Sequence, residues 1–301
     1  MTARIGYGTG GLLRIGSDRG RRERLAAAVA NGITHFDTAP IYGFGEAERT
    51  LGRFLRGRRD QVTVTTKFGL RPSSLATRLA PLQRIARRAL RLFPSLRGSA
   101  ARGSGVLYAP PDFSAATVRA SLESSLRALR TDRVDFFLAH QASAAALPGP
   151  ELIGLLERLQ REGKIGAFGV ATDFDWLAPV LAARPKLARV VQFDCDPTGH
   201  PARALGNCDL LVTFGLLGRS LATLRERLAA ASGATARELA ALGDDTLGGL
   251  LLRALALANP DGIVLMQSRS IERIERNVRA VNHDGDDARV RQVIGFFEPH
   301  S

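Results

Sequence analysis

Strand-like and helix-like segments alternate along most of this 301-residue chain. Short apolar runs bounded by polar residues or glycine indicate strands, and longer amphipathic stretches between them indicate helices. This alternation is typical of a parallel sheet with helices packed outside it. The predicted strands are residues 4–8, 34–37, 62–67, 134–139, 165–170, 190–193, 210–214 and 262–266.

Eight strands, each followed by helical or loop residues, predict an α/β fold of the (β/α)8 TIM-barrel class, a single domain over residues 1–301. A doubly wound open sheet is the alternative, but it favours a Gly-rich dinucleotide turn after a strand, and the chain has no clean G-x-G-x-x-G in that place. Ser114 is expected to cap its helix. The predicted helices are residues 21–31, 46–55, 114–129, 150–162, 174–183, 247–258, 271–281 and an outer C-terminal helix at about 286–298.

Residues 69–113 interrupt the alternation and are predicted to form a basic insertion after the third strand. From Gln61 to Pro111 the chain has eight Arg and Lys67, but no Asp or Glu. Apolar residues at three- and four-residue steps indicate one helical face: Leu75, Leu79, Leu82, Ile85, Ala86, Ala89, Leu92 and Phe93. The opposite side carries Arg84, Arg87, Arg88 and Arg91.

Because the insertion leaves from the strand that ends at Lys67, it is expected over or beside the substrate entrance. One interpretation is a lid whose apolar face packs on the barrel. The other is a basic amphipathic helix that recruits an anionic partner, such as a membrane surface or a phosphorylated or carrier-bound substrate.

The net charge of +13 is carried almost entirely by arginine. Lysine occurs only at positions 67, 164 and 186, so 39 of the 42 cationic side chains are arginines. This bias is typical of a GC-rich genome, and no nucleic-acid-binding motif accompanies the charge. No nucleic-acid partner is therefore expected.

The two cysteines, Cys195 and Cys208, form neither a disulfide framework nor a metal-ligand pattern. They fit a reducing compartment, and no metal site is expected. No apolar run approaches the ~20 residues of a transmembrane helix, and the N-terminus does not resemble a signal peptide. The sequence therefore predicts a cytoplasmic protein without a transmembrane segment.

Three neighbouring strands end on polar side chains that can carry chemistry. Asp37, Lys67 and His140 each follow a short apolar run, and Tyr42 lies in a Pro/Gly loop five residues after Asp37. In a parallel barrel these strand ends share the rim where active sites lie. Each residue alone has a structural explanation, such as a loop cap or a surface ion pair. Together they predict a catalytic set.

These residues resemble the signatures of the aldo-keto reductase family. The run from Phe36 to Gly43 is similar to its first signature, Thr65 to Lys67 to its lysine strand, and Ala139-His140 to its histidine strand. Further matches cover nearly the whole chain: Gly8 and Thr9 in the first strand, Gln192 near the nicotinamide, Phe214 where an aromatic ring stacks on nicotinamide, and Ser268 to Asn277 in the adenosine-phosphate segment.

Two positions depart from the family pattern. The family's Ser-Asn pair, which holds the nicotinamide amide, is Ala171-Thr172 here, so Thr172 is the remaining candidate ligand. The family's lysine near the ribose phosphate is Gln267. Both departures concern cofactor affinity and choice, and neither changes the catalytic set.

The resemblance implies an NAD(P)H-dependent oxidoreductase that interconverts a carbonyl (aldehyde, ketone or sugar) and an alcohol. Hydride addition leaves an alkoxide that needs a proton, and an ordinary phenol with a pKa of about 10 is a slow donor. Lys67 is expected to lower the pKa of Tyr42, with Asp37 holding Lys67 charged and His140 donating to the carbonyl oxygen. Tyr42 is the predicted proton donor in reduction and base in oxidation.

The cofactor is expected to be NADP(H) rather than NAD(H). Arg269 and Arg273 flank the start of the last barrel helix, where an anion would meet a helix N-terminus and guanidinium groups. Asn277, one turn beyond Arg273, is a candidate for reading adenine. The loop after the seventh strand is expected to approach the pyrophosphate with its backbone. The residues of this loop that would do so are Gly215, Leu217 and Gly218.

Two other function classes stay open at this stage. The first is a barrel that binds the cofactor as a sensor or subunit and turns over poorly, which Ala171-Thr172 favours. The second is a basic surface that binds anionic partners. The expected substrate is a small-molecule carbonyl or alcohol, with anionic or carrier-bound compounds as an option. Neither its identity nor the oligomeric state follows from the sequence.

Overall fold

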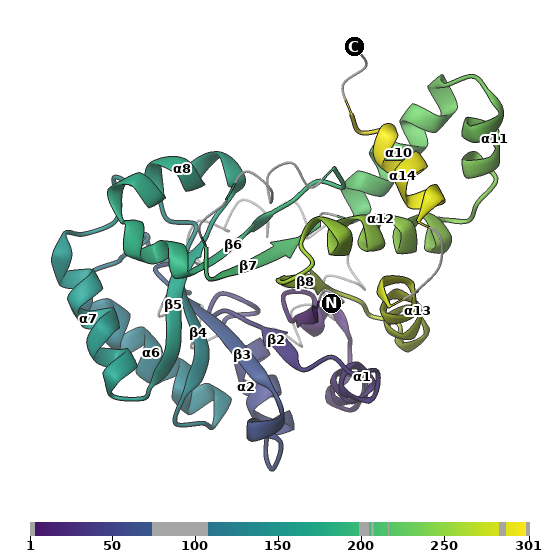
Figure 1. Cartoon of the computed structure of the whole chain (residues 1–301). Helices are drawn as coiled ribbons and strands as arrows, with labels where there is room; N and C mark the ends of the chain where they lie inside the picture. The colour runs from purple at the N-terminus through teal and green to yellow at the C-terminus, as the bar shows by residue number, and fades with distance from the viewer. Residues whose placement is uncertain are drawn as a thin grey trace, which may run out of the picture.

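In the computed structural model, which describes residues 4–73, 108–198, 205, 208–215, 217–282 and 287–298, eight parallel strands close into a barrel. They follow chain order, and the last strand pairs with the first. The predicted single-domain (β/α)8 barrel is therefore confirmed (Figure 1). The strands are β1 (Arg4–Gly8), β2 (His35–Asp37), β3 (Thr63–Phe68), β4 (Val134–His140), β5 (Ile165–Ala171), β6 (Val190–Asp194), β7 (Leu210–Phe214) and β8 (Ile263–Met266).

Helices surround the barrel on its outside (Figure 1). None of the helices in the described ranges has both the length and the apolar character that crossing a membrane requires. The helices in these ranges are α1 (Asp18–Ala30), α2 (Glu46–Phe54), α6 (Ala115–Leu129), α7 (Pro150–Arg161), α8 (Phe174–Ala183), α10 (Leu217–Ala230), α11 (Ala234–Ala240), α12 (Asp244–Ala258), α13 (Ile271–Val281) and α14 (Ala288–Gly295).

Successive residues of each strand face the barrel interior and the helix layer in turn. On the helix side, Phe36, Val64 and Phe137 are completely buried. On the interior side, a second cluster fills the barrel: Leu138, Ala171, Val190, Val212, Ile263 and Leu265. The same period puts Asp37 and Lys67 on the interior side, at the C-terminal ends of β2 and β3.

A buried histidine fills the interior below these strand ends. The Nδ1 atom of His35 lies 2.8 Å from Thr63 Oγ1, and its Nε2 atom lies 3.2 Å from Thr65 Oγ1. Burial lowers the pKa of His35 to about 3, so this ring is neutral at physiological pH. A Cβ atom on Gly6 would lie 2.8 Å from His35 Cδ2 and 2.6 Å from Leu265 Cδ2, so a larger residue here would force these side chains to move.

The two ends of the predicted insertion lie within the described residues. Pro72 and Tyr108 form an isolated antiparallel bridge, and the Asp112 N–H donates to Gly69 O at 3.0 Å. Residues 74–107, with the predicted apolar helical face and its four arginines, lie outside the described residues. The lid and the anionic-partner interpretations therefore both stay predictions.

The start of α6 corrects the expected role of Ser114. Ser114 occupies the N-cap position, but its side chain makes no capping hydrogen bond. Asp112 supplies the acceptors instead, taking the Ser114 N–H at 2.9 Å and the Thr117 hydroxyl at 2.6 Å. These hydrogen bonds, that of Thr117 foremost, lower the pKa of Asp112 to about 2. A charged acceptor two residues upstream has displaced the weaker hydroxyl cap.

Four outer helices form a separate apolar cluster beside the barrel, distinct from the cluster in the barrel interior. α10, α11 and α12 pack with α14, which lies in the predicted C-terminal segment 286–298 (Figure 1). The buried members of this cluster are Leu224, Leu228, Ala236, Leu239, Leu247, Leu251 and Val293. Within this cluster, α12 packs against β8 of the barrel and against α10.

Candidate active site

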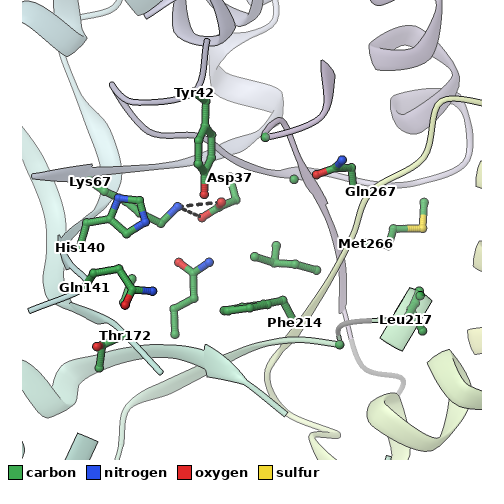
Figure 2. A pocket seen from close by; sticks show the side chains of 17 residues that line it. Asp37, Tyr42, Lys67, His140, Gln141, Thr172, Phe214, Leu217, Met266 and Gln267 are labelled. Carbon is green, nitrogen blue, oxygen red and sulfur yellow. Dashed lines mark hydrogen bonds and ion pairs between the residues drawn. The ribbon is translucent and has the colours of Figure 1, made fainter. Parts of the chain in front are cut away.

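A cavity of about 440 Å³ opens at the C-terminal ends of the strands (Figure 2). It brings together Asp37, Tyr42, Lys67 and His140, as the sequence predicts. The other lining residues are Gly8, Gly10, Gln141, Ala171, Thr172, Gln192, Phe214, Gly215, Leu217, Gly218, Leu265, Met266 and Gln267. The described residues hold no group of three His, Cys, Asp or Glu side chains placed to bind a metal ion.

Asp37 and Lys67 form a buried ion pair across β2 and β3. The Lys67 Nζ atom lies 2.7 Å from each carboxylate oxygen of Asp37 and 3.0 Å from Thr38 O. Lys67 also forms a hydrogen bond with Tyr42, and these partners together compensate for the burial of the ammonium. Burial alone would lower the pKa of Lys67, but the Asp37 carboxylate beside it raises that pKa above its ordinary value. Lys67 therefore stays charged.

Tyr42 points into the cavity from the loop after β2, with its hydroxyl directed toward Lys67 and Asp37 (Figure 2). Its ring centroid lies 5.3 Å from Lys67 Nζ. The loop turns sharply because Gly43, Phe44 and Gly45 all have positive φ angles, of 58°, 57° and 83°. A Cβ atom on Gly43 would also lie 1.8 Å from Leu13 Cδ1, so this position needs glycine.

The pKa of Tyr42 differs in direction from the sequence expectation. Burial raises the pKa of the phenol above its ordinary value, and the charge of Lys67 only opposes part of that rise. Lys67 does lower the pKa of Tyr42 as expected, by its charge and by a hydrogen bond, but burial raises that pKa by more. The depth of the cavity outweighs the ammonium, so Tyr42 is fully protonated at neutral pH.

His140 lies at the end of β4, edge-on to Tyr42. The two ring centroids are 6.1 Å apart and the rings are nearly perpendicular, at 87°. Burial and the charge of Lys67 lower the pKa of His140 to about 3, so the ring is neutral and carries one N–H donor. Its Nδ1 atom has no hydrogen-bond partner within the described part of the chain. His140 therefore has hydrogen-bonding capacity left for a ligand.

Gln192 offers a second unpartnered atom in the cavity wall. The side chain is 3% exposed, and its Oε1 atom has no partner within the described ranges. Such a buried carbonyl is costly unless it accepts a hydrogen bond. Phe214 and Thr172 line the same cavity (Figure 2). An aromatic ring beside an amide acceptor fits a flat ligand that carries an N–H group.

Seven of the predicted cofactor residues line this cavity: Gly8, Thr172, Gln192, Phe214, Gly215, Leu217 and Gly218. The expected loop after β7 is shorter than predicted, because Leu217 and Gly218 already belong to the first turn of α10. Their backbone thus contributes a helix N-terminus, which favours anions, to the cavity wall.

The other predicted cofactor residues do not line the cavity. Thr9 Oγ1 donates to Asp37 O at 3.0 Å, so Thr9 holds β1 against the end of β2. Ser268 Oγ donates to Ser270 O at 3.1 Å. Asn277 is buried, and its amide Nδ2 donates to Met266 Sδ at 3.5 Å.

The two predicted phosphate ligands lie on the outside of the barrel. Arg269 is exposed, and its carbonyl oxygen accepts from Arg24 Nε at 3.1 Å. Arg273 is 58% exposed and forms an ion pair with Asp245 at 3.0 Å. Sequence reasoning did not anticipate Asp245, which belongs to α12.

Four lining residues were missed by the sequence analysis: Gly10, Gln141, Leu265 and Met266. Gln141 directly follows His140, and its position after a strand-end residue was the available signal. It has a positive φ angle of 51°, and its Nε2 donates to Asp173 Oδ1 at 3.2 Å. Gln267, noted as a departure from the family pattern, lies over Gly10 and Gly11; a Cβ atom on Gly11 would be 1.7 Å from Gln267 Nε2.

The sequence of this chain is similar to a protein family and to several characterised proteins. The profile of the Aldo/keto reductase family matches residues 4–196. D-threo-aldose 1-dehydrogenase from Pseudomonas sp is 32% identical over 186 residues, which are 56% of this chain and 49% of that protein. An NADH-specific methylglyoxal reductase from Escherichia coli is 31% identical over 157 residues, 50% of this chain and 40% of that protein. The chain thus spans about half the length of these curated relatives or less.

Solved structures show the same fold over nearly the whole chain. An aldo-keto reductase from Bacillus halodurans, in its holo form, superposes with a TM-score of 0.71 at 20% identity and covers 98% of this chain and 91% of its own. An aldo/keto reductase from Klebsiella pneumoniae in complex with NADP and acetate has a TM-score of 0.64 at 21% identity, covering 96% and 89%. With the profile match over well more than half its length, the chain belongs to the aldo/keto reductase family.

Proposed function

We propose that this protein is a nicotinamide-dependent oxidoreductase that interconverts a small carbonyl compound and its alcohol, with NADP(H) as the preferred cofactor. The observation that carries the proposal is the buried Asp37–Lys67 pair beside Tyr42 and a neutral His140, all facing one cavity. A purely structural role would not require an ion pair, a phenol and an imidazole with unused hydrogen-bonding capacity at one open rim.

The cavity fits a nicotinamide, which when bound supplies or accepts the hydride. The unpartnered Gln192 Oε1 is placed to accept from a carboxamide N–H, and Phe214 presents an aromatic ring in the same wall. Thr172 offers a hydroxyl where the family pattern has an amide. The first turn of α10, at Leu217 and Gly218, offers a helix N-terminus to a pyrophosphate.

The proton moves through Tyr42. In reduction the phenol O–H donates to the oxygen of the former carbonyl, and in oxidation the phenolate takes that proton back. Lys67 stabilises the phenolate as it forms, and Asp37 keeps Lys67 charged and fixed in place. Neutral His140 donates one N–H to the carbonyl oxygen and directs it toward Tyr42.

The preference for NADP(H) is supported by Arg269 and Arg273 at the start of α13, since arginine favours phosphate groups. The comparisons include both cofactors: a structure in complex with NADP and a relative named as NADH-specific. The substrate class rests on the relatives named for an aldose and for methylglyoxal, and on a cavity of about 440 Å³ that suits a small compound beside the nicotinamide.

A binding titration followed by an activity panel tests this function. NADPH and NADH are each titrated against the protein while its intrinsic fluorescence is followed, and small aldehydes, ketones and sugars are then offered with the cofactor that binds. Binding with turnover supports the proposal. Binding with no turnover on the whole panel favours the cofactor sensor, and no binding of either dinucleotide contradicts both.

A further inference from the structure

One carboxylate, Asp245, binds two arginines of the neighbouring helix. Its Oδ1 atom accepts from Arg273 Nε at 3.2 Å and lies 3.0 Å from Arg273 Nη2. Its Oδ2 atom accepts from Arg276 Nη1. The hydrogen bond from Arg276 and the charges of both arginines lower the pKa of Asp245, so it is ionised at neutral pH. The guanidinium groups are thus already engaged by an anion of the chain itself.

The position of Asp245 brings this anion to the start of α13. α12 runs into β8, so its first turn, which contains Asp245, lies near the strand ends that form the cavity rim. α13 leaves β8 at the same rim, with Ser270 Oγ accepting the Arg273 N–H at 3.2 Å. The carboxylate therefore occupies the Nε–Nη2 edge of the Arg273 guanidinium, where a phosphate could otherwise bind.

We propose that Asp245 is a specificity-determining residue that limits the preference for NADPH over NADH. The proposal rests on the proposed function. Asp245 acts as an internal anion, which the ribose phosphate of NADPH must displace from Arg273 and Arg276. NADH has no such phosphate, so it binds without that displacement. The carboxylate therefore weakens NADPH selectively and leaves the two cofactors closer in affinity than the arginines alone would make them.

The adjacent residue provides a matched control. Asp244 also lies in the first turn of α12, and its Oδ1 accepts from Arg225 of α10 at 2.8 Å and 3.0 Å. Both acids tie α12 to a neighbouring helix through exposed or half-exposed arginine pairs. Only Asp245 touches Arg273. If these acids only held the helices together, substitutions at Asp244 and Asp245 would have similar effects on cofactor binding.

The experiment measures dissociation constants for NADPH and NADH by fluorescence titration at low, constant ionic strength. It compares wild type, Asp245→Asn, Asp245→Glu and Asp244→Asn. We expect Asp245→Asn to bind NADPH about threefold to fivefold more tightly, the scale of an exposed ion pair, with NADH within about twofold. Asp245→Glu, which keeps the charge, and Asp244→Asn are expected to match wild type.

Three outcomes would overturn the inference. Asp245→Asn that leaves the NADPH to NADH ratio unchanged, or that weakens NADPH, shows that the carboxylate does not compete with the phosphate. An equal gain from Asp244→Asn assigns the effect to the general loss of negative charge. All three results leave the proposed function intact, whereas a wild-type protein that binds neither dinucleotide contradicts the proposed function as well. Thermal unfolding of each variant verifies that the fold is kept.

Discussion

The two halves of the candidate site are built differently. The proposed acid–base side consists of Asp37, Tyr42, Lys67 and His140, on and beside β2, β3 and β4. Three of these residues are buried, and Tyr42 is half-buried. The proposed dinucleotide side, at the starts of α12 and α13, consists of Asp245, Arg269, Arg273 and Arg276, which are exposed or half-exposed. On the first side the charged side chains of Asp37 and Lys67 are 4% and 1% exposed, whereas on the second one carboxylate, Asp245, is paired with two arginines that face solvent.

The consequence is a difference in what each side can tolerate. Removing one partner of a buried ion pair leaves an uncompensated charge and costs about 3–5 kcal/mol, whereas a surface pair contributes about 0–1 kcal/mol. The proposed proton transfer therefore takes place where substitutions destabilise strongly, and the proposed choice of cofactor depends on residues where they destabilise little. The following predictions test this contrast, beginning with the largest expected effect.

Tyr42→Phe is expected to lower the turnover number for carbonyl reduction by ~10²-fold or more, because the transition state loses its proton donor. The dissociation constant for NADPH is expected to stay within about twofold of wild type, since the cofactor is proposed to lie on β6, β7 and α10. Steady-state kinetics and fluorescence titration measure the two quantities. If the variant keeps most of the wild-type rate on any accepted carbonyl, Tyr42 is not the proton donor.

Lys67→Met is expected to lower the free energy of unfolding by about 3–5 kcal/mol, because Asp37 is left buried without its partner. The double variant Asp37→Asn with Lys67→Met is expected to recover part of this loss. Urea unfolding of these two variants and of Arg273→Gln compares the loss of a buried partner with the loss of an exposed one. The free energy of unfolding of Arg273→Gln is expected to stay within about 1 kcal/mol of wild type. Equal losses for the buried and the exposed pair would contradict the contrast between the two sides.

Arg273→Gln is expected to raise the NADPH dissociation constant about fivefold to tenfold and to leave NADH nearly unchanged. The guanidinium is proposed to meet the ribose phosphate, which NADH lacks. Titration of both cofactors measures the effect, with Arg279, an exposed arginine of the same helix, changed to Gln as the control. An equal loss for NADPH and NADH would show that Arg273 does not contact that phosphate.

The acid–base side could be predicted from the sequence because its signal is local. A polar residue at the end of an apolar run is unusual, and parallel topology brings such ends to one rim. The strand bounds near Asp37, Lys67 and His140 differ from the predicted ones by one residue at most, and the structure brings all three side chains together with Tyr42. The direction of the Tyr42 pKa was missed because burial depth is a property of the folded cavity.

The dinucleotide side was harder to predict because its contacts join distant, exposed residues. Asp245 and Arg273 are 28 positions apart on different helices, and nothing in either local pattern singles out the pair. Helix packing also decides whether Leu217 and Gly218 form a loop or the first turn of α10. The periodicity around Asn277 does not show that its amide turns toward Met266. The basic helix expected within residues 74–107 lies outside the described residues and stays a prediction from the sequence.

Tyr7→Phe is expected to have a smaller effect that links the two sides. The Tyr7 hydroxyl donates to Ser268 O at 2.7 Å, so β1 holds the segment that leads into α13. The variant leaves a buried carbonyl without its donor, which costs about 1–3 kcal/mol of stability. We expect both dinucleotides to bind about twofold to threefold more weakly, with an unchanged turnover number at saturating cofactor. A loss of turnover at saturation would place Tyr7 on the acid–base side.

The smallest expected effect is that of pH on carbonyl reduction. Reduction needs a protonated Tyr42, and burial raises the pKa of this phenol above its ordinary value, so its protonated fraction is constant from pH 6 to 8. His140, with a pKa of about 3, stays neutral over the same range. The turnover number for reduction is therefore expected to change by less than about twofold between pH 6 and 8.

Oxidation of the alcohol is expected to behave in the opposite way, because Tyr42 must first lose its proton. Its rate should rise with pH toward the high pKa of the phenol, while reduction stays level and declines only above that pKa. Turnover numbers in both directions, at saturating cofactor and constant ionic strength, measure this asymmetry. A reduction rate that falls steeply between pH 6 and 8 would mean that a group with a pKa in that range donates the proton. Neither Tyr42 nor His140, as this cavity holds them, could then be that group.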